Sequence, residues 1–173
     1  MNIFSLSLIY LFLNSFFNLQ FQDVDGNTIN MSSFQGKKVL IVNIATEADS
    51  LKVQQLSGLQ QLQLRFADSL VVIAFPSNSY GHESKTNAAI KQFCENNYQS
   101  SFIIASKADV NGNGMQSVFN WLAYKTENGD MDASVHNDFQ KFLIDKEGHL
   151  TGVMSSKVQP LDSLMIKNIT ANY

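Results

Sequence analysis

The stretch of residues 42–59 reads VNIATEADSLKVQQLSGL, which is typical of a buried strand, a loop and the start of a helix. A helix N-terminus favours an anion, so such a junction suits a redox nucleophile acting as a thiolate. Ala48, Asp49 and Ser50 lie at this junction, and none of them carries sulfur. A serine hydroxyl cannot pass through the oxidation states of a thiol, so Ser50 is no substitute for cysteine.

Cys94 is the only cysteine, which excludes an intramolecular disulfide and a cysteine-rich zinc site. The pattern places Cys94 beside Ile90 and Phe93 on the apolar face of a predicted helix, near its C-terminal end. Apolar surroundings and a helix C-terminus both raise the pKa of a thiol. We therefore expect Cys94 to pack in the core, with a redox role as the alternative.

A hydrolytic site is another alternative. Ser50 or Ser79 would be the nucleophile and His82 or His136 the base, within hydrogen-bond reach of each other. The sequence cannot show such proximity, and loop histidines are usually solvated. Together with these histidines, three acidic residues would make the opening of the site polar and acidic: Asp49, Glu83 and Asp138.

No metal site and no cofactor are predicted. The three histidines are not at metal-ligand spacing with one another or with acids on one helix. Residues 109–114, DVNGNG, match the first half of a calcium loop, but the twelfth position is Asn120, which cannot supply a bidentate carboxylate. A turn rich in glycine and asparagine is the expected structure there.

Length and composition predict one globular domain. The chain has 173 residues, of which 45% are hydrophobic and 16% charged, enough for a sizeable core. A net charge of -3, without a cluster of Lys and Arg, argues against a nucleic-acid partner. The sequence indicates no other class of partner.

The N-terminus resembles a targeting segment. Residues 3–13, IFSLSLIYLFL, are as long as the hydrophobic region of a signal peptide and too short to span a bilayer easily. No Lys or Arg precedes Lys37, so the only positive charge there is the terminal amine. We expect residues 1–14 to be a leader and residues 15–173 to be the domain. The protein would then be exported, periplasmic or secreted, without stable membrane insertion after leader removal; otherwise it would be cytoplasmic.

Hydrophobic patterning predicts a mixed α/β domain with helices on both faces of a sheet. Residues 38–45 and 70–76 are continuous apolar runs, typical of strands buried on both faces. Asp25-Gly26 marks the turn of an N-terminal hairpin. The other predicted strands are 18–22, 28–31, 102–105, 138–145 and 149–154, and the predicted helices are 51–66, 87–97, 115–125 and 161–170.

Five segments, in this order along the chain, resemble the glutathione peroxidases: DVDGNTINMSSFQGKKVLIVNIA, FPSNSYG, NAAIKQFC, DVNGNG and DFQKFLIDKEG. The resemblance covers about residues 16–169. It implies a thioredoxin-like three-layer αβα sandwich with a mixed central sheet and an N-terminal hairpin. It also implies hydroperoxide reduction by a cysteine or selenocysteine, in the response to oxidative stress and with a thiol as reductant.

The residues that carry the family's chemistry are replaced. Aligned from Asn43, the nucleophile position falls on Ala48; aligned from residues 57–59, it falls on Ser50, so the loop has two extra residues. The family's glutamine corresponds to Ser79, and its Trp-Asn pair to Asn137 and Asp138. We therefore predict a protein that kept the fold, lost hydroperoxide reduction and acts as a binding or scaffold protein. The alternatives are peroxidase activity through Cys94 with a thiol reductant, and the hydrolytic site.

Overall fold

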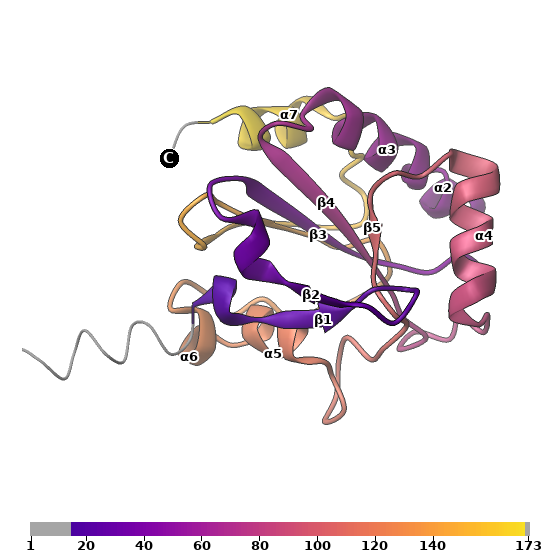
Figure 1. Cartoon of the computed structure of the whole chain (residues 1–173), viewed down its shortest axis with the longest axis horizontal. Helices are drawn as coiled ribbons and strands as arrows, with labels where there is room; N and C mark the ends of the chain where they lie inside the picture. The colour runs from indigo at the N-terminus through magenta and orange to yellow at the C-terminus, as the bar shows by residue number, and fades with distance from the viewer. Residues whose placement is uncertain (1–14, 172–173) are drawn as a thin grey trace, which may run out of the picture.

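The computed structural model describes residues 15–171, so the predicted leader, residues 1–14, lies outside the described part. Two sheets are present, a two-stranded hairpin and a five-stranded mixed sheet (Figure 1). The strands are β1 (Gln20–Gln22), β2 (Thr28–Asn30), β3 (Lys38–Ile44), β4 (Leu70–Pro76), β5 (Ile103–Ile104), β6 (Lys141–Ile144) and β7 (Leu150–Met154). The helices are η1 (Phe16–Asn18), η2 (Met31–Phe34), α2 (Ser50–Val53), α3 (Gln55–Arg65), α4 (Asn87–Tyr98), α5 (Ser117–Ala123), α6 (Lys125–Asn128) and α7 (Ser163–Thr170).

The strand predicted to be central is central. The order of the large sheet is β5-β4-β3-β6-β7, so β3 lies between β4, to which it is parallel, and β6, to which it is antiparallel. Both β3 and β4 are buried along their whole length, as their continuous apolar runs predicted. Because β3 and β4 are parallel, the loops that follow them leave the sheet at the same edge.

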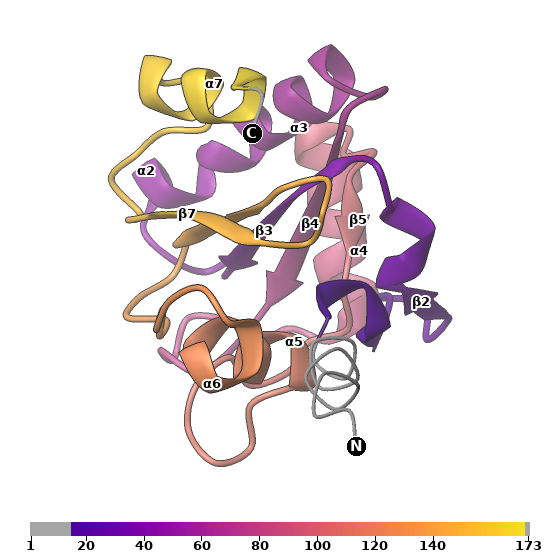
Figure 2. The ribbon, with the colours of Figure 1, turned by 90° about the vertical axis from the view of Figure 1, so that its left-hand side faces the viewer.

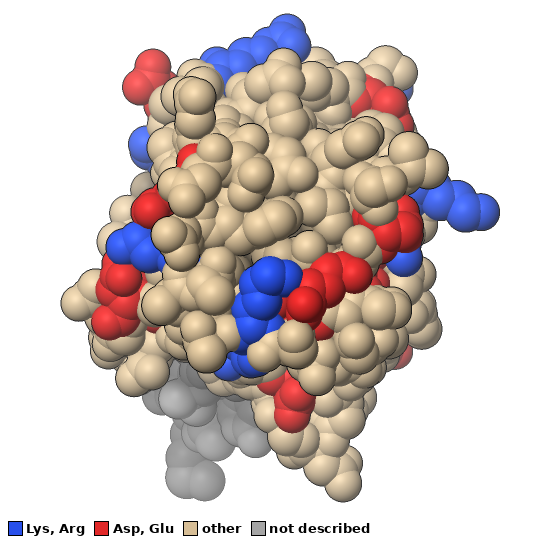
Figure 3. All heavy atoms as spheres, turned by 90° about the vertical axis from the view of Figure 1, so that its right-hand side faces the viewer, with Lys and Arg blue, Asp and Glu red and all other residues tan. Residues whose placement is uncertain are grey.

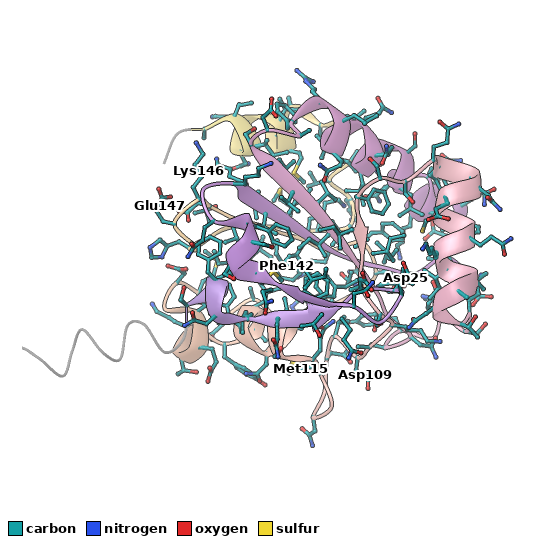
Figure 4. The ribbon with its side chains drawn as sticks, viewed as in Figure 1. Asp25, Asp109, Met115, Phe142, Lys146 and Glu147 are labelled. Atoms are coloured by element: carbon teal, nitrogen blue, oxygen red, sulfur yellow. The ribbon has the colours of Figure 1, made fainter. Side chains whose placement is uncertain are left out.

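Helices cover both faces of the sheet, which gives three layers. One apolar cluster joins alternate residues of β3 and β4 to α3, α4 and α7, and a second joins the other residues to α5, η1 and the hairpin. Figures 1 and 2 show α7 and α3 above the sheet and α5 and α6 below it. Phe142, from β6, points from the middle of the sheet into the second cluster, where it meets Phe119 edge-on (Figure 4).

Several predicted elements are shorter or broken in the structure, and three of them differ most clearly. The helix predicted over 51–66 is two helices, because Ser57 N–H bonds the Gln54 carbonyl three residues back and tightens the turn at the junction. The helix predicted over 115–125 ends at Ala123, where Tyr124 is extended, and α6 follows separately. The strand predicted from residue 138 begins at Lys141, because Phe139 has a φ of 65° and cannot be extended.

The exposed surface carries mixed charge. Figure 3 shows acidic and basic groups side by side on the face where α4 lies, within a largely uncharged surface. Lys91 of α4 contributes to this pattern by pairing with Asp25 at 2.7 Å and with Glu95 at 4.0 Å. Within residues 15–171, no helix is both long and apolar enough to cross a bilayer.

Candidate functional site

The loops that follow β3 and β4 meet the loop that precedes β6. Glu47 N–H, in the first loop, donates to the His82 carbonyl in the second at 3.1 Å. The His82 ring nitrogen Nδ1 lies 2.7 Å from Asp138 Oδ2 in the third loop. In that third loop, Phe139 N–H also donates to the Asn43 carbonyl of β3, at 2.7 Å. Residues far apart in sequence therefore form one polar region at the carboxyl ends of β3 and β4.

Two glutamates fix the first loop against the second. The fully buried Glu83 carboxylate accepts from Thr46 N–H at 2.6 Å and from the Thr46 hydroxyl at 3.1 Å. The exposed Glu47 carboxylate accepts from Ser84 through its hydroxyl and its N–H, and Lys85 Nζ lies 3.2 Å away. These Ser84 hydrogen bonds, with Lys85 beside them, lower the pKa of Glu47 to about 2. Glu47 is therefore a carboxylate at neutral pH.

His82 and Asp138 differ strongly in exposure. The Asp138 side chain is 1% exposed and that of His82 is 49% exposed, so the histidine lies between the carboxylate and solvent. Tyr80, two residues before His82, donates its hydroxyl to the Val135 carbonyl at 2.7 Å. Burial, and secondarily the Asp138 charge, raise the pKa of Tyr80 above its usual value, while a hydrogen bond with Asn111 opposes them.

The residues at the predicted nucleophile position carry no redox group and have structural contacts. Asp49 is the N-cap of α2, where its carboxylate accepts from Lys52 N–H at 3.0 Å. Ala48 packs at the edge of the apolar cluster under α3. Ser50 is exposed as the first residue of α2. The junction of strand, loop and helix expected from the sequence is present, with α2 only four residues long.

The hydrolytic alternative requires a serine bonded to a histidine. Ser79 instead bonds Ser77 Oγ at 2.9 Å and accepts from Val110 N–H at 3.1 Å. In the described part of the chain, neither Ser50 nor Ser79 forms a hydrogen bond with His82 or His136. His136 is exposed, and its N–H donates to Gln140 Oε1. The hydrolytic alternative therefore lacks the serine–histidine hydrogen bond that it requires.

Cys94 is fully buried in α4, against the apolar cluster that includes Leu59 and Phe102. Burial, and secondarily the charges of Glu83 and Glu95, raise the pKa of the thiol to about 12. The expected packing role of Cys94 agrees with this position. A thiol with so high a pKa is almost entirely protonated at neutral pH, and the thiolate is the nucleophilic form.

Sequence reasoning missed a buried lysine beside this region. Lys141 of β6 is fully buried, and its ammonium donates to Gln55 Oε1 at 2.6 Å and to the Phe139 carbonyl at 2.8 Å. Burial lowers the pKa of Lys141 to about 8, and the Asp162 charge opposes that shift. The signal was a lysine inside the apolar run of a predicted strand.

The segment that resembles half of a calcium loop is a turn. Gln116 N–H bonds the Asp109 carbonyl at 3.0 Å and closes it, and Figure 4 shows Asp109 and Met115 at its base, on the side of the hairpin. Over residues 15–171, no group of three or more His, Cys, Asp or Glu side chains could hold a metal ion.

Comparison with known proteins identifies the family. The glutathione peroxidase family model matches residues 16–123. The glutathione peroxidase-like peroxiredoxin GPX5 of Chlamydomonas reinhardtii is 35% identical over 147 residues, which are 84% of this chain and 89% of that protein. The glutathione peroxidase-like peroxiredoxin HYR1 of Saccharomyces cerevisiae is 34% identical over 152 residues, which are 86% of this chain and 91% of that protein.

Solved structures show the same fold. The crystal structure of Trgpx in its apo form superposes with a TM-score of 0.67 at 26% identity, over 91% of this chain and 96% of that one. A thioredoxin-family thiol:disulfide interchange protein from Chlorobium tepidum superposes with a TM-score of 0.58 at 18% identity, over 87% and 92% of the two chains. The thioredoxin-like αβα sandwich is confirmed, and the chain belongs to the glutathione peroxidase family.

Proposed function

We propose that this protein has lost hydroperoxide reduction and acts as a non-catalytic binding or scaffold member of its family. One observation carries the proposal: Ala48 and Asp49, at the end of the loop between β3 and α2, and Ser50, the first residue of α2, lie where a sulfur or selenium nucleophile would act. Peroxide reduction in this family needs a group that is oxidised by the peroxide and reduced again by a thiol. None of these three side chains can do so.

The buried thiol supports the proposal. Peroxidase activity through Cys94 would require a thiolate that peroxide can reach. Cys94 is fully buried and its pKa is raised to about 12. Both facts oppose formation of a reactive thiolate in the folded protein.

The charge around the site supports it as well. Asp138 is buried where the resemblance implies an uncharged asparagine, and Glu47 is charged at neutral pH. Both carboxylates would repel a thiolate and raise its pKa, which is the reverse of what a peroxidatic site needs.

A turnover assay tests the proposal. The purified protein and its Cys94→Ser variant are assayed with hydrogen peroxide and organic hydroperoxides, using glutathione or thioredoxin as reductant, beside an active member of the family. We expect no turnover from either protein. Activity in the native chain that vanishes in Cys94→Ser would overturn the proposal and make Cys94 the nucleophile. Activity retained in both would identify a different reaction centre.

Export remains a proposal, supported by the length of the apolar run at residues 3–13. We expect cleavage near residue 14, because the resemblance to the family begins at about residue 16. Intact-mass measurement of protein from its native host should give a chain that starts near Ser15. A mature chain that retains Met1 would count against a cleaved signal peptide.

A further inference from the structure

The two edges of the five-stranded sheet differ in how they are covered. The edge strand β5 has only two residues, and the loop of the N-terminal hairpin bonds to it: Val24 N–H donates to the Ile104 carbonyl at 2.8 Å. The other edge strand, β7, has five residues and pairs, among the described strands, only with β6. Figure 2 shows β7 facing the viewer, with α7 above it and α6 below it. The edge formed by β7 is therefore the open one.

The alternation of the backbone shows which groups of β7 point out of the sheet. Ser77 N–H bonds the Ile44 carbonyl, so even-numbered residues of β3 face β4 and odd-numbered residues face β6. The pairs between β3 and β6 join odd residues to even ones, so the odd-numbered residues of β6 face β7. Their partners in β7 are Gly152 and Met154. Val153, between these two, therefore points its N–H and its carbonyl away from the sheet.

Val153 is exposed, and its outward groups have no protein partner. The residue is 39% exposed. Near the start of the strand, Leu150 N–H is already bonded to Asp130 Oδ2 at 2.8 Å. Over residues 15–171, no hydrogen bond outside the ladder with β6 reaches the Val153 backbone. The free part of the edge is thus centred on one residue that offers one donor and one acceptor.

The sequence of β7 lacks the features that keep open edges apart. Edge strands commonly carry Lys or Pro, or a charged residue that points inward. Leu150–Met154, which reads LTGVM, contains none of these. Its register shift lies beside Leu143 and Ile144, at the start of the strand, and leaves Val153 in regular pairing with Phe142. Two copies of this edge can therefore meet without bringing like charges together.

We propose that two copies of this protein associate through β7, antiparallel about a two-fold axis at Val153. One outward N–H and one outward carbonyl are complementary to the same two groups of a second copy, so each Val153 N–H donates to the other copy's Val153 carbonyl. The two valine side chains then lie opposite each other and cover apolar surface that is exposed in the single chain.

A second copy fits this edge because the edge has no charge for a different partner to complement, and a two-fold axis satisfies both outward groups at once. Few residues take part, so we expect weak association that depends on protein concentration. The inference goes beyond the proposed function and does not depend on it.

Sedimentation velocity of the purified protein, from micromolar to near-millimolar concentration, tests the contact. We expect the native protein to shift from monomer towards dimer as its concentration rises. Val153→Lys places two like charges opposite each other and should weaken association by roughly tenfold or more, with a larger effect at low salt. Leu64→Lys is the matched control, because it introduces the same charge at a residue that is 65% exposed on α3 rather than on the edge strand. This control should associate as the native protein does.

A second pair of variants separates backbone pairing from side-chain charge. Val153→Pro removes the outward N–H, which an edge strand tolerates where that N–H faces solvent, and should also weaken association by roughly tenfold or more. Val153→Thr keeps both backbone groups and a branched side chain, and should retain association. Circular dichroism checks that all the variants fold. Hydrogen exchange of the Val153 amide should slow as the concentration of the native protein rises.

Two results would overturn the inference. One is a native protein that stays monomeric at every concentration, which would leave the edge to solvent or to an extended segment of another protein. The other is association that persists unchanged in Val153→Lys, which would place the contact elsewhere on the surface. None of these readouts depends on peroxide turnover, so failure here and failure of the proposed function are distinguishable.

Discussion

The strands β3 and β4 differ from the loops that follow them in the interactions that hold each region in place. The strands are buried throughout, and their apolar side chains divide between the two clusters that hold the three layers together. The loops contain charged and amide side chains, which bond one another and the backbone: Thr46 with Glu83, Glu47 with Ser84, and His82 with Asp138. Packing governs the first region and hydrogen bonding governs the second.

This difference explains how a family member can keep its fold and change its chemistry. A large strand residue contacts both neighbouring strands and a helix layer, so its replacement disturbs the whole core. A loop residue has few such contacts and can be replaced at a small cost in stability. Under the proposed function, the positions that changed lie in the loops at the carboxyl end of β3, whereas β3 itself keeps the apolar run of a central strand.

The largest expected loss of stability comes from replacing a buried residue of the strands. Phe75→Ala removes a fully buried ring of β4 that meets Phe21 at 5.0 Å and Phe119 at 5.3 Å between ring centres. We expect the free energy of unfolding to fall by about 3–5 kcal/mol in urea titration. Leu51→Ala, at a side chain 73% exposed beside the site, should cost less than about 0.5 kcal/mol. Similar costs for the two variants would contradict the division between the regions.

Lys141 lies on the border between the regions and gives the second largest effect. Its pKa is lowered to about 8 in the folded protein from an ordinary 10.5, so the native state binds fewer protons than the unfolded chain between these values. The contribution of Lys141 to stability therefore rises with pH through this window, by about 2 kcal/mol between pH 7 and 9.5. Lys141→Met should remove this contribution, so that its stability gains less from rising pH than that of the native protein, whereas Lys146→Met, at an exposed lysine of the β6–β7 turn (Figure 4), should keep it. The measurement is denaturant unfolding of each variant across that pH range.

The two regions also differ in how much the sequence could predict. The bounds of β3 and β4 agree with the predicted runs to within a residue, because continuous apolar runs specify strands buried on both faces. The position of Cys94 in the core followed from helical periodicity in the same way. Both predictions depend on patterns that repeat locally along the chain.

The loops could not be predicted because their contacts join distant residues. His82 and Asp138 are 56 positions apart, and the fold alone brings them to 2.7 Å. Phe139, with its φ of 65°, shortens β6 although nothing in the side-chain alternation marks the turn. The nearest partners of the other loop residues could not be predicted either: Asp49 bonds Lys52 of α2, and Ser79 bonds Ser77 and Val110.

A smaller effect is expected at the start of α2. Asp49→Ala removes the N-cap bond to Lys52 N–H and an exposed ion pair at 3.5 Å, and should cost about 1 kcal/mol, nearly all of it from the cap. Asp49→Asn keeps a capping oxygen and should cost only a few tenths of 1 kcal/mol. Thermal and urea unfolding of both variants measures the difference. A cost above about 2 kcal/mol for Asp49→Ala would place this loop among the parts that hold the fold.

The smallest effect is expected from returning a thiol to the site. In a Cys94→Ser background, Ala48→Cys introduces the only cysteine at a position that packs at the edge of the apolar cluster and is flanked by Asp49 and the ionised Glu47. Partial burial and adjacent carboxylates both disfavour a thiolate, so the pH profile of iodoacetamide alkylation should have its midpoint above the ordinary thiol pKa of about 8.5. Peroxide turnover should stay at background. Adding Glu47→Gln should move the alkylation midpoint to lower pH by removing one neighbouring charge. A midpoint well below 8.5 in Ala48→Cys itself would show that the site still stabilises a thiolate, and the loss of function would then reside in that one residue alone.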